Sequence, residues 1–97
     1  MKAPDYLDLL AERVVCCTKV NNAAERVCLE RGVLEAIGHV LDPGVLSDAT
    51  AMRQGLDYFC IEIGGALPRR MRHLFVAGFV GVVSGFRAHT SLRRLDV

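Results

Sequence analysis

The sequence predicts an all-α fold of four helices, and three features of its 97 residues support this prediction. Apolar residues recur every three or four positions over most of the chain, which is the spacing of a helix with one buried face. Residues that cap or break helices separate these periodic segments. No run alternates between apolar and polar residues, as a half-buried strand does. We therefore expect one helical domain (1–97) with helices over 4–20, 22–41, 48–65 and 68–88.

The first two predicted helices are amphipathic and are joined by a short turn. Asn22, followed three residues later by Glu25, has the spacing of a capping box, in which side chains satisfy free backbone N–H groups. The Asp-Pro-Gly sequence at 42–44 ends the second helix, because proline cannot continue it. We expect the core side of the first helix to carry Leu7, Leu10, Val14 and Cys17. That of the second should carry Val27, Leu34, Ile37 and Leu41, widened by Leu29, Val33 and Val40.

The third predicted helix begins at Ser47 or Asp48 and ends at the glycine pair 64–65, a frequent helix stop. Its core stripe follows the i, i+4, i+7, i+11 spacing and consists of Met52, Leu56, Phe59 and Ile63. Tyr58 and Ile61 are apolar but lie outside this stripe. We expect these two side chains to contact a partner; the alternative is that they are ordinary exposed apolar residues.

The last helix contains the longest uncharged stretch of the chain, thirteen residues from 74 to 86. This stretch is too short for a membrane span, which needs about 20 apolar residues. We expect a central apolar helix whose bulky side lies in the core: Phe75, Phe79, Val82, Val83 and Phe86. Small residues gather on its other side: Ala77, Gly78, Gly81, Ser84 and Gly85.

The glycines of this helix require a physical reason, because each costs about 0.5–1 kcal/mol relative to alanine. The reason available is the close approach of another helix, which a Cβ atom would prevent. We expect that neighbour to be the same helix of a second copy, which would make the protein a homodimer. The alternative is a contact with another helix of the same chain, inside the bundle. Apolar residues form 52% of the chain, and such a share in so small a domain also favours an oligomer or a partner-binding surface.

The four cysteines, at positions 16, 17, 28 and 60, contain no C-x-x-C motif and match no zinc pattern. We expect no signal peptide, since charged residues and a proline replace the apolar run that one requires. A reduced cytoplasmic protein follows from these two observations. The helix pattern predicts that Cys17 and Cys60 resist alkylation and that Cys16 and Cys28 react sooner.

The sequence lacks the residue patterns of the common catalytic and cofactor-binding sites. Its histidines, His39, His73 and His89, belong to no nucleophile or metalloprotease motif, and no glycine-rich loop follows a strand. Glu35 and His39 lie four residues apart on one helix, where a surface pair is a simpler interpretation than half of a metal site. We expect a protein that is not an enzyme and has no cofactor or metal.

A basic run at the start of the last helix reverses the charge balance of the chain. Residues 1–67 carry ten acidic and six basic side chains, whereas residues 68–97 carry six arginines and one acid. Cations in the first turn of a helix face the positive end of its dipole, so the site favours an anion. We expect acids of the second and third helices, a phosphate backbone or an acidic partner to bind Arg69, Arg70, Arg72 and His73.

These observations favour a protein-interaction module. The leading interpretation is a small cytoplasmic regulator or inhibitor, acting like an adaptor or antiactivator, that binds itself and a larger protein such as a transcription factor. The alternative is a nucleic-acid-binding regulator that uses the arginines at 69–72, although a net charge of +1 is unusual for that class. A third hypothesis is a redox sensor that acts through Cys16.

Overall fold

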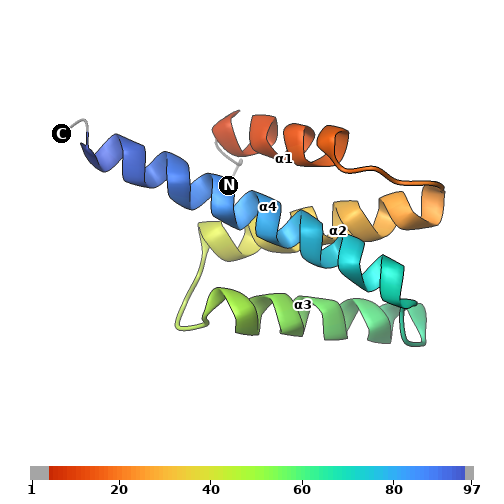
Figure 1. Cartoon of the computed structure of the whole chain (residues 1–97). Coiled ribbons are helices and arrows are strands. Elements are labelled where there is room, and N and C mark those ends of the chain that lie inside the picture. Colours follow the sequence, from red (N-terminus) through yellow and green to blue (C-terminus); the bar gives the residue numbers. More distant parts are fainter. Residues whose placement is uncertain (1–4, 96–97) are drawn as a thin grey trace.

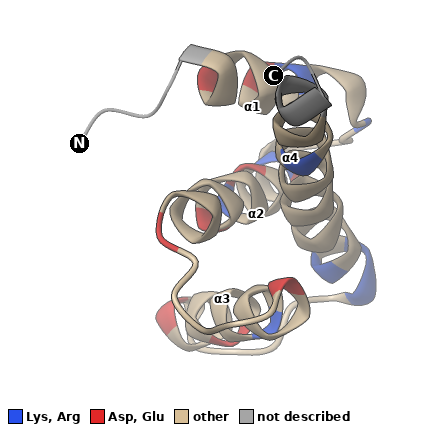
Figure 2. Cartoon of the chain, turned by 90° about the vertical axis from the view of Figure 1, so that its left-hand side faces the viewer, with Lys and Arg blue, Asp and Glu red and all other residues tan. Residues whose placement is uncertain are grey.

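The computed structural model describes residues 5–95, which form four α-helices joined by short connections. The helices are α1 (Asp5–Cys17), α2 (Ala23–Leu41), α3 (Asp48–Ile63) and α4 (Arg69–Leu95). The first three lie side by side as a layer, and α4 crosses one face of this layer (Figure 1). Seen end-on, α4 stands on one side of the stacked α1, α2 and α3, and none of the described helices covers the other side (Figure 2). The predicted all-α class and four helices are confirmed for these residues.

The local helix signals are confirmed by the hydrogen bonds at the helix ends. The Asn22 side chain accepts a bond from the Glu25 N–H at 2.9 Å, and the Glu25 carboxylate accepts one from the Asn21 N–H at 2.9 Å. The Ser47 hydroxyl accepts from the Thr50 N–H at 3.1 Å and starts α3. Gly64 ends α3 with φ of 79°, in the left-handed region that favours glycine.

The ends of α1 and α4 differ from the prediction. α1 stops at Cys17 instead of residue 20. α4 continues to Leu95 instead of residue 88, because no glycine or proline follows residue 85 to interrupt it. Tyr6 packs α1 onto this longer helix: its hydroxyl donates to the Gly85 carbonyl at 2.8 Å, and its ring stacks on His89 with 3.6 Å between centroids.

α2 and α4 share the largest interhelical contact, and they cross where each has a glycine. A Cβ atom on Gly32 of α2 would overlap the carbonyl oxygen of Phe75, and one on Gly78 of α4 would overlap that of Leu29. The two backbones are therefore in direct contact. Only glycine permits this approach, because any other residue would place a side-chain atom inside the opposite backbone.

Two groups of buried side chains flank this crossing, and α4 contributes a phenylalanine to each. The group between α1, α2 and α4 consists of Leu7, Val33, Ala36, Phe79, Val82 and Val83. The group between α2, α3 and α4 consists of Cys28, Leu29, Phe59, Leu67, Leu74 and Phe75. The core side predicted for the last helix is thus confirmed at its two phenylalanines and two valines, while Phe86 is half-buried.

The core side predicted for the second helix is wrong in its central stripe and confirmed at the flanking residues Leu29 and Val33. Val27, Leu34 and Leu41 are 55%, 64% and 42% exposed, and Ile37 is only half-buried. The reason is that Gly32 must face α4, and a residue two positions further points about 200° away around a helix. The apolar side chains that α2 buries are the predicted Leu29 and Val33 together with Cys28 and Ala36, and the polar ones are Glu25 and His39.

Smaller corrections apply to α1 and α3. In α1, Leu7 is buried as predicted, but Cys17 is exposed because α1 ends there and its predicted continuation is absent. In α3, Phe59 is buried, whereas Ile63 is half-exposed at the last turn of the helix.

We predict that Gly32→Ala strongly destabilises the fold while Gly38→Ala does not. The first substitution forces the α2 and α4 backbones apart, and overpacking of this kind costs about 3 kcal/mol or more when the obstacle is backbone. A Cβ at Gly38, on the same helix, meets nothing within 4 Å. That alanine should raise the free energy of unfolding by about 0.5–1 kcal/mol. Urea denaturation followed by circular dichroism measures both, and equal stability of the two variants would contradict the crossing.

Candidate functional site

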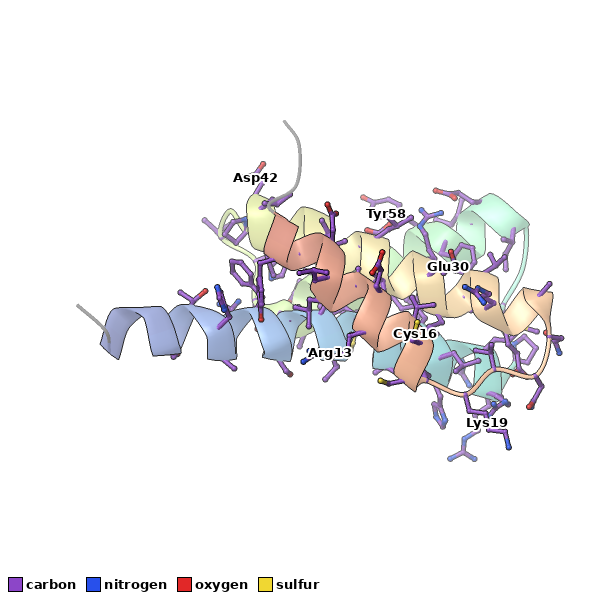
Figure 3. The ribbon with its side chains drawn as sticks, turned by 90° about the horizontal axis from the view of Figure 1, so that it is seen from above. Arg13, Cys16, Lys19, Glu30, Asp42 and Tyr58 are labelled. Atoms are coloured by element: carbon purple, nitrogen blue, oxygen red, sulfur yellow. The ribbon has the colours of Figure 1, made fainter. Side chains whose placement is uncertain are left out.

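The charges of the protein are divided between the two sides of the helix layer. α4 contains arginines and no acid, whereas most carboxylates lie on α1, α2 and α3 (Figure 2). Arg13 and Lys19 point toward the side of α4, while Glu30, Asp42 and Tyr58 lie on the opposite side (Figure 3). The side away from α4 is therefore acidic, and the α4 side is basic.

The side of α2 that faces away from α4 carries an apolar stripe. Val27, Leu34 and Leu41 follow one another at seven-residue intervals, so they lie on one side of the helix. All three are exposed, because α1, α3 and α4 pack against the other sides of α2. We call these residues the α2 stripe. Its apolar side chains have the spacing of a buried helix face, but they remain exposed in the described fold.

A groove of about 580 Å³ runs beside this stripe, between α1 and α2. Its floor is apolar and includes Ala11, Val15, Val33, Leu34 and Ile37. Its rim carries Asp8, Glu12, Cys16, Arg26 and Glu30. The only cation of the lining, Arg26, donates to Glu30 at 3.1 Å, so the remaining charge of the rim is negative. We call this feature the α1–α2 groove.

The neighbouring groove, between α2 and α3, is smaller and polar. Its volume is about 220 Å³, and Tyr58 forms part of its wall. Arg31 bridges the two helices with bonds to Glu35 at 3.1 Å and to both oxygens of Glu62 at 2.6 and 2.7 Å. These bonds raise the pKa of Arg31 and lower that of Glu62. The predicted partner contacts Tyr58 and Ile61 are both exposed, but only Tyr58 lines a groove.

A buried histidine joins α2 to the start of α3. His39 Nε2 lies 2.8 Å from an Asp48 oxygen, and its ring stacks on Phe79 with 6.0 Å between centroids. Arg87 of α4 donates to both Asp48 oxygens at 2.6 and 3.0 Å. Its guanidinium, followed by the His39 hydrogen bond, lowers the pKa of Asp48 to about 2. The network connects three helices.

This network corrects the surface pair expected between Glu35 and His39. Glu35 binds Arg31, and His39 turns inward to Asp48, so the two side chains do not pair with each other. Across the described residues, no cluster of three or more His, Cys, Asp or Glu side chains is placed to hold a metal ion.

Three of the four residues of the predicted basic cluster, Arg69, Arg70 and His73, line one hollow. Arg70 donates to the buried Glu25 at 3.0 Å and to the Lys19 carbonyl at 3.3 Å, and this pairing lowers the pKa of Glu25. An acid of the second helix thus neutralises Arg70, as one interpretation expected. Arg69 and His73 line a shallow hollow of about 630 Å³ with Lys19 and Arg70, whereas Arg72, although exposed, is not part of its wall.

The small-residue side of α4 faces helices of its own chain. A Cβ on Gly81 would lie 3.1 Å from Val14 of α1, and one on Gly85 would lie 2.6 Å from Leu10. Gly78 meets α2, as described above. The close approach that the glycines predict is present, but α1 and α2 supply it, so these glycines are not available for a seam between two copies. Ala77 and Ser84 are exposed, and homodimerisation itself stays a prediction.

Two of the four cysteine predictions are wrong. Cys28 is 3% exposed, and its burial raises the pKa of the thiol, because it lies on the side of α2 that α4 covers. Cys17 is exposed at the end of α1. Cys16 is exposed as expected, and Cys60 is half-buried. Cys28 is buried because the Gly32 contact rotates this side of α2 toward α4. Cys17 is exposed because α1 ends there.

Comparisons with protein-family models, with curated proteins and with solved structures found no match to this chain. Among the helices described, none combines the length and apolar character that crossing a bilayer requires.

We predict that the stabilising effect of Asp48 disappears in acid. Because the folded pKa lies near 2 and the ordinary value is 3.8, the ionised carboxylate stabilises the fold above about pH 4. This contribution is lost as the pH falls from about 4 to 2. The difference in free energy of unfolding between wild type and Asp48→Asn should therefore be present at pH 5 and shrink as the pH falls through 2.

Asp57→Asn is the matched control for this measurement, because Asp57 is exposed on the same helix and makes no salt bridge within the described residues. Its stability should follow that of wild type throughout urea titrations at each pH. A difference for Asp48→Asn that persists unchanged at pH 2 would contradict the assigned pairing.

Proposed function

We propose that the protein is a non-enzymatic protein-interaction module that binds a larger partner through the side of the layer away from α4. The α2 stripe carries this proposal. Three large apolar side chains at heptad spacing are exposed on a helix whose other sides are packed. Exposed apolar residues that form a stripe, unlike scattered ones, are typical of an interaction surface.

The dimensions of the surface support a protein partner. Val27 and Leu41 are fourteen residues apart, which corresponds to about 21 Å along a helix. The adjacent groove is wide and shallow at about 580 Å³ and lies alongside the stripe at Leu34. A linear apolar strip of this length matches a secondary-structure element better than a compact small molecule.

We further propose a regulatory role in the cytoplasm, in which the module occupies a surface of a larger protein such as a transcription factor, as an antiactivator or adaptor does. The absence of a catalytic motif from the sequence supports a role in binding. The thiol-sensor hypothesis remains a proposal as well, and the exposure of Cys16 beside the groove supports it.

The substitution Leu34→Glu should weaken binding of the partner without unfolding the protein. Leu34 is already 64% exposed, so glutamate adds no buried charge. Loss of a central apolar anchor costs about 2 kcal/mol or more of binding, which is about a thirtyfold loss of affinity. Immobilised wild type should retain a protein from the source cell that the Leu34→Glu variant does not retain. Once purified, that partner should bind wild type more tightly than it binds the variant.

Val80→Glu is the control for this comparison, because Val80 is similarly exposed but lies on α4. This variant should bind like wild type. If every retained protein binds all three forms equally, the proposed surface is wrong.

A nucleic-acid-binding regulator is the second candidate, because Arg69 and His73 are exposed beside Lys19 in one hollow. If this hollow contacts phosphates, binding of duplex DNA should weaken with salt by a log–log slope of about −0.9 for each neutralised phosphate. The variant Arg69→Ala should flatten the slope by about one such contact. Arg69 is preferable to Arg70, whose partner Glu25 belongs to the fold. No binding at about 50 mM salt would exclude this candidate.

A further inference from the structure

We propose that the α1–α2 groove and the α2 stripe together bind an amphipathic helix whose apolar stripe is flanked by lysine or arginine. This inference rests on the proposed interaction function and names the chemistry of the partner. It depends on three observations about the groove: its shape, the charges of its rim and the position of Leu34.

The groove has the shape that a helix needs. α1 and α2 lie side by side, and a helix can rest between two such neighbours with its apolar residues on the floor. On α2, the lining runs from Arg26 to Ile37, which is about 16 Å or three helical turns. The lining contains the small residue Ala11 beside larger aliphatic residues, so the apolar side chains of a bound helix would meet an apolar surface. Leu34 belongs both to the lining of this groove and to the α2 stripe.

The rim determines which helix is favoured. Asp8 and Glu12 follow each other by four residues on α1, and Glu30 stands across the groove on α2. Arg26 and Glu30 pair with each other, so the negative charge of the rim comes from Asp8 and Glu12, and a bound helix meets carboxylates mainly along its α1 flank. Basic flanks complement this rim, whereas acidic flanks oppose it.

The same charges argue against a second copy as the occupant. In a twofold dimer through this face, the same surface of both copies is buried, so two rims of the same net negative charge would be brought together. The basic helix that the chain does possess, α4, is packed against the layer, and its large exposed apolar residue within the described side chains is Val80 alone. A basic amphipathic helix of a different protein therefore fits the surface best.

The adjacent cysteines provide a direct reporter of occupancy. Cys16 lines the groove, whereas Cys17 is exposed but is not part of the lining. In a Cys17→Ser protein, alkylation reports on Cys16, and in a Cys16→Ser protein it reports on Cys17. Cys28 is buried and Cys60 is half-buried, so mass spectrometry of the tryptic peptide around position 16 separates the relevant thiol.

The experiment uses two synthetic helical peptides with the same leucine stripe, one with lysine flanks and one with glutamate flanks. The lysine peptide at saturation should slow alkylation of Cys16 about tenfold and that of Cys17 less than about twofold, because only the first thiol loses access. Its affinity should fall about thirtyfold for Leu34→Glu, as expected for a central anchor. The double charge reversal Asp8→Lys, Glu12→Lys should weaken the lysine peptide and strengthen the glutamate peptide.

Several results would overturn the inference. Equal binding of both peptides would show that the rim does not select charge, and equal protection of both thiols would show that the peptide is not in the groove. Self-association that Leu34→Glu abolishes would make a second copy the occupant. If neither peptide binds but a protein is retained in a Leu34-dependent manner, only the partner chemistry is wrong. If no such protein is retained either, the proposed function fails as well.

Discussion

The backbone contact between α2 and α4, where Gly32 meets Phe75 and Gly78 meets Leu29, is the constraint on which the other features of this structure depend. It brings the backbones of α2 and α4 together and so determines how α2 is rotated in the layer. Phe75 and Phe79 then enter separate buried groups on the two sides of the crossing. The same rotation turns Leu34 away from the core, because residues two positions apart point in nearly opposite directions on a helix. One close contact thereby creates both the packed face of the layer and its exposed apolar face.

Polar contacts hold α4 to the layer at both ends of this crossing. Near its start, Arg70 reaches the buried Glu25, which also accepts the hydrogen bond of the turn before α2. Further along, Arg87 reaches Asp48 at the beginning of α3, and His39 of α2 completes that network. Arg70, one of the arginines that suggest an anion-binding surface, therefore serves the fold. Those that remain exposed at the start of α4 form a smaller basic area than the sequence alone suggests.

The separation of charge follows from the same arrangement and supports a division of roles between the two sides. α4 covers one side of the layer with a helix that contains no acid, while the other side keeps the carboxylates of α1 and α2 around an apolar groove. The arrangement leaves a surface that is apolar at its centre and acidic at its rim, which is the usual organisation of a selective protein interface. The proposed binding of a basic amphipathic helix uses both properties at once.

The sequence by itself determined the helices, their caps and the bulky side of α4. These features depend on contacts between residues a few positions apart, such as Asn22 with Glu25 or Ser47 with Thr50, so the local pattern contains the necessary information. It also indicated that the glycines of α4 allow a close helix contact. Only the tertiary structure decided which helix makes that contact and which side of α2 is buried. α2 has apolar residues on two sides, and the spacing of these residues is equally consistent with burial of either side. The choice between them depends on Gly32, whose lack of a side chain carries no hydropathy signal but permits the approach of α4.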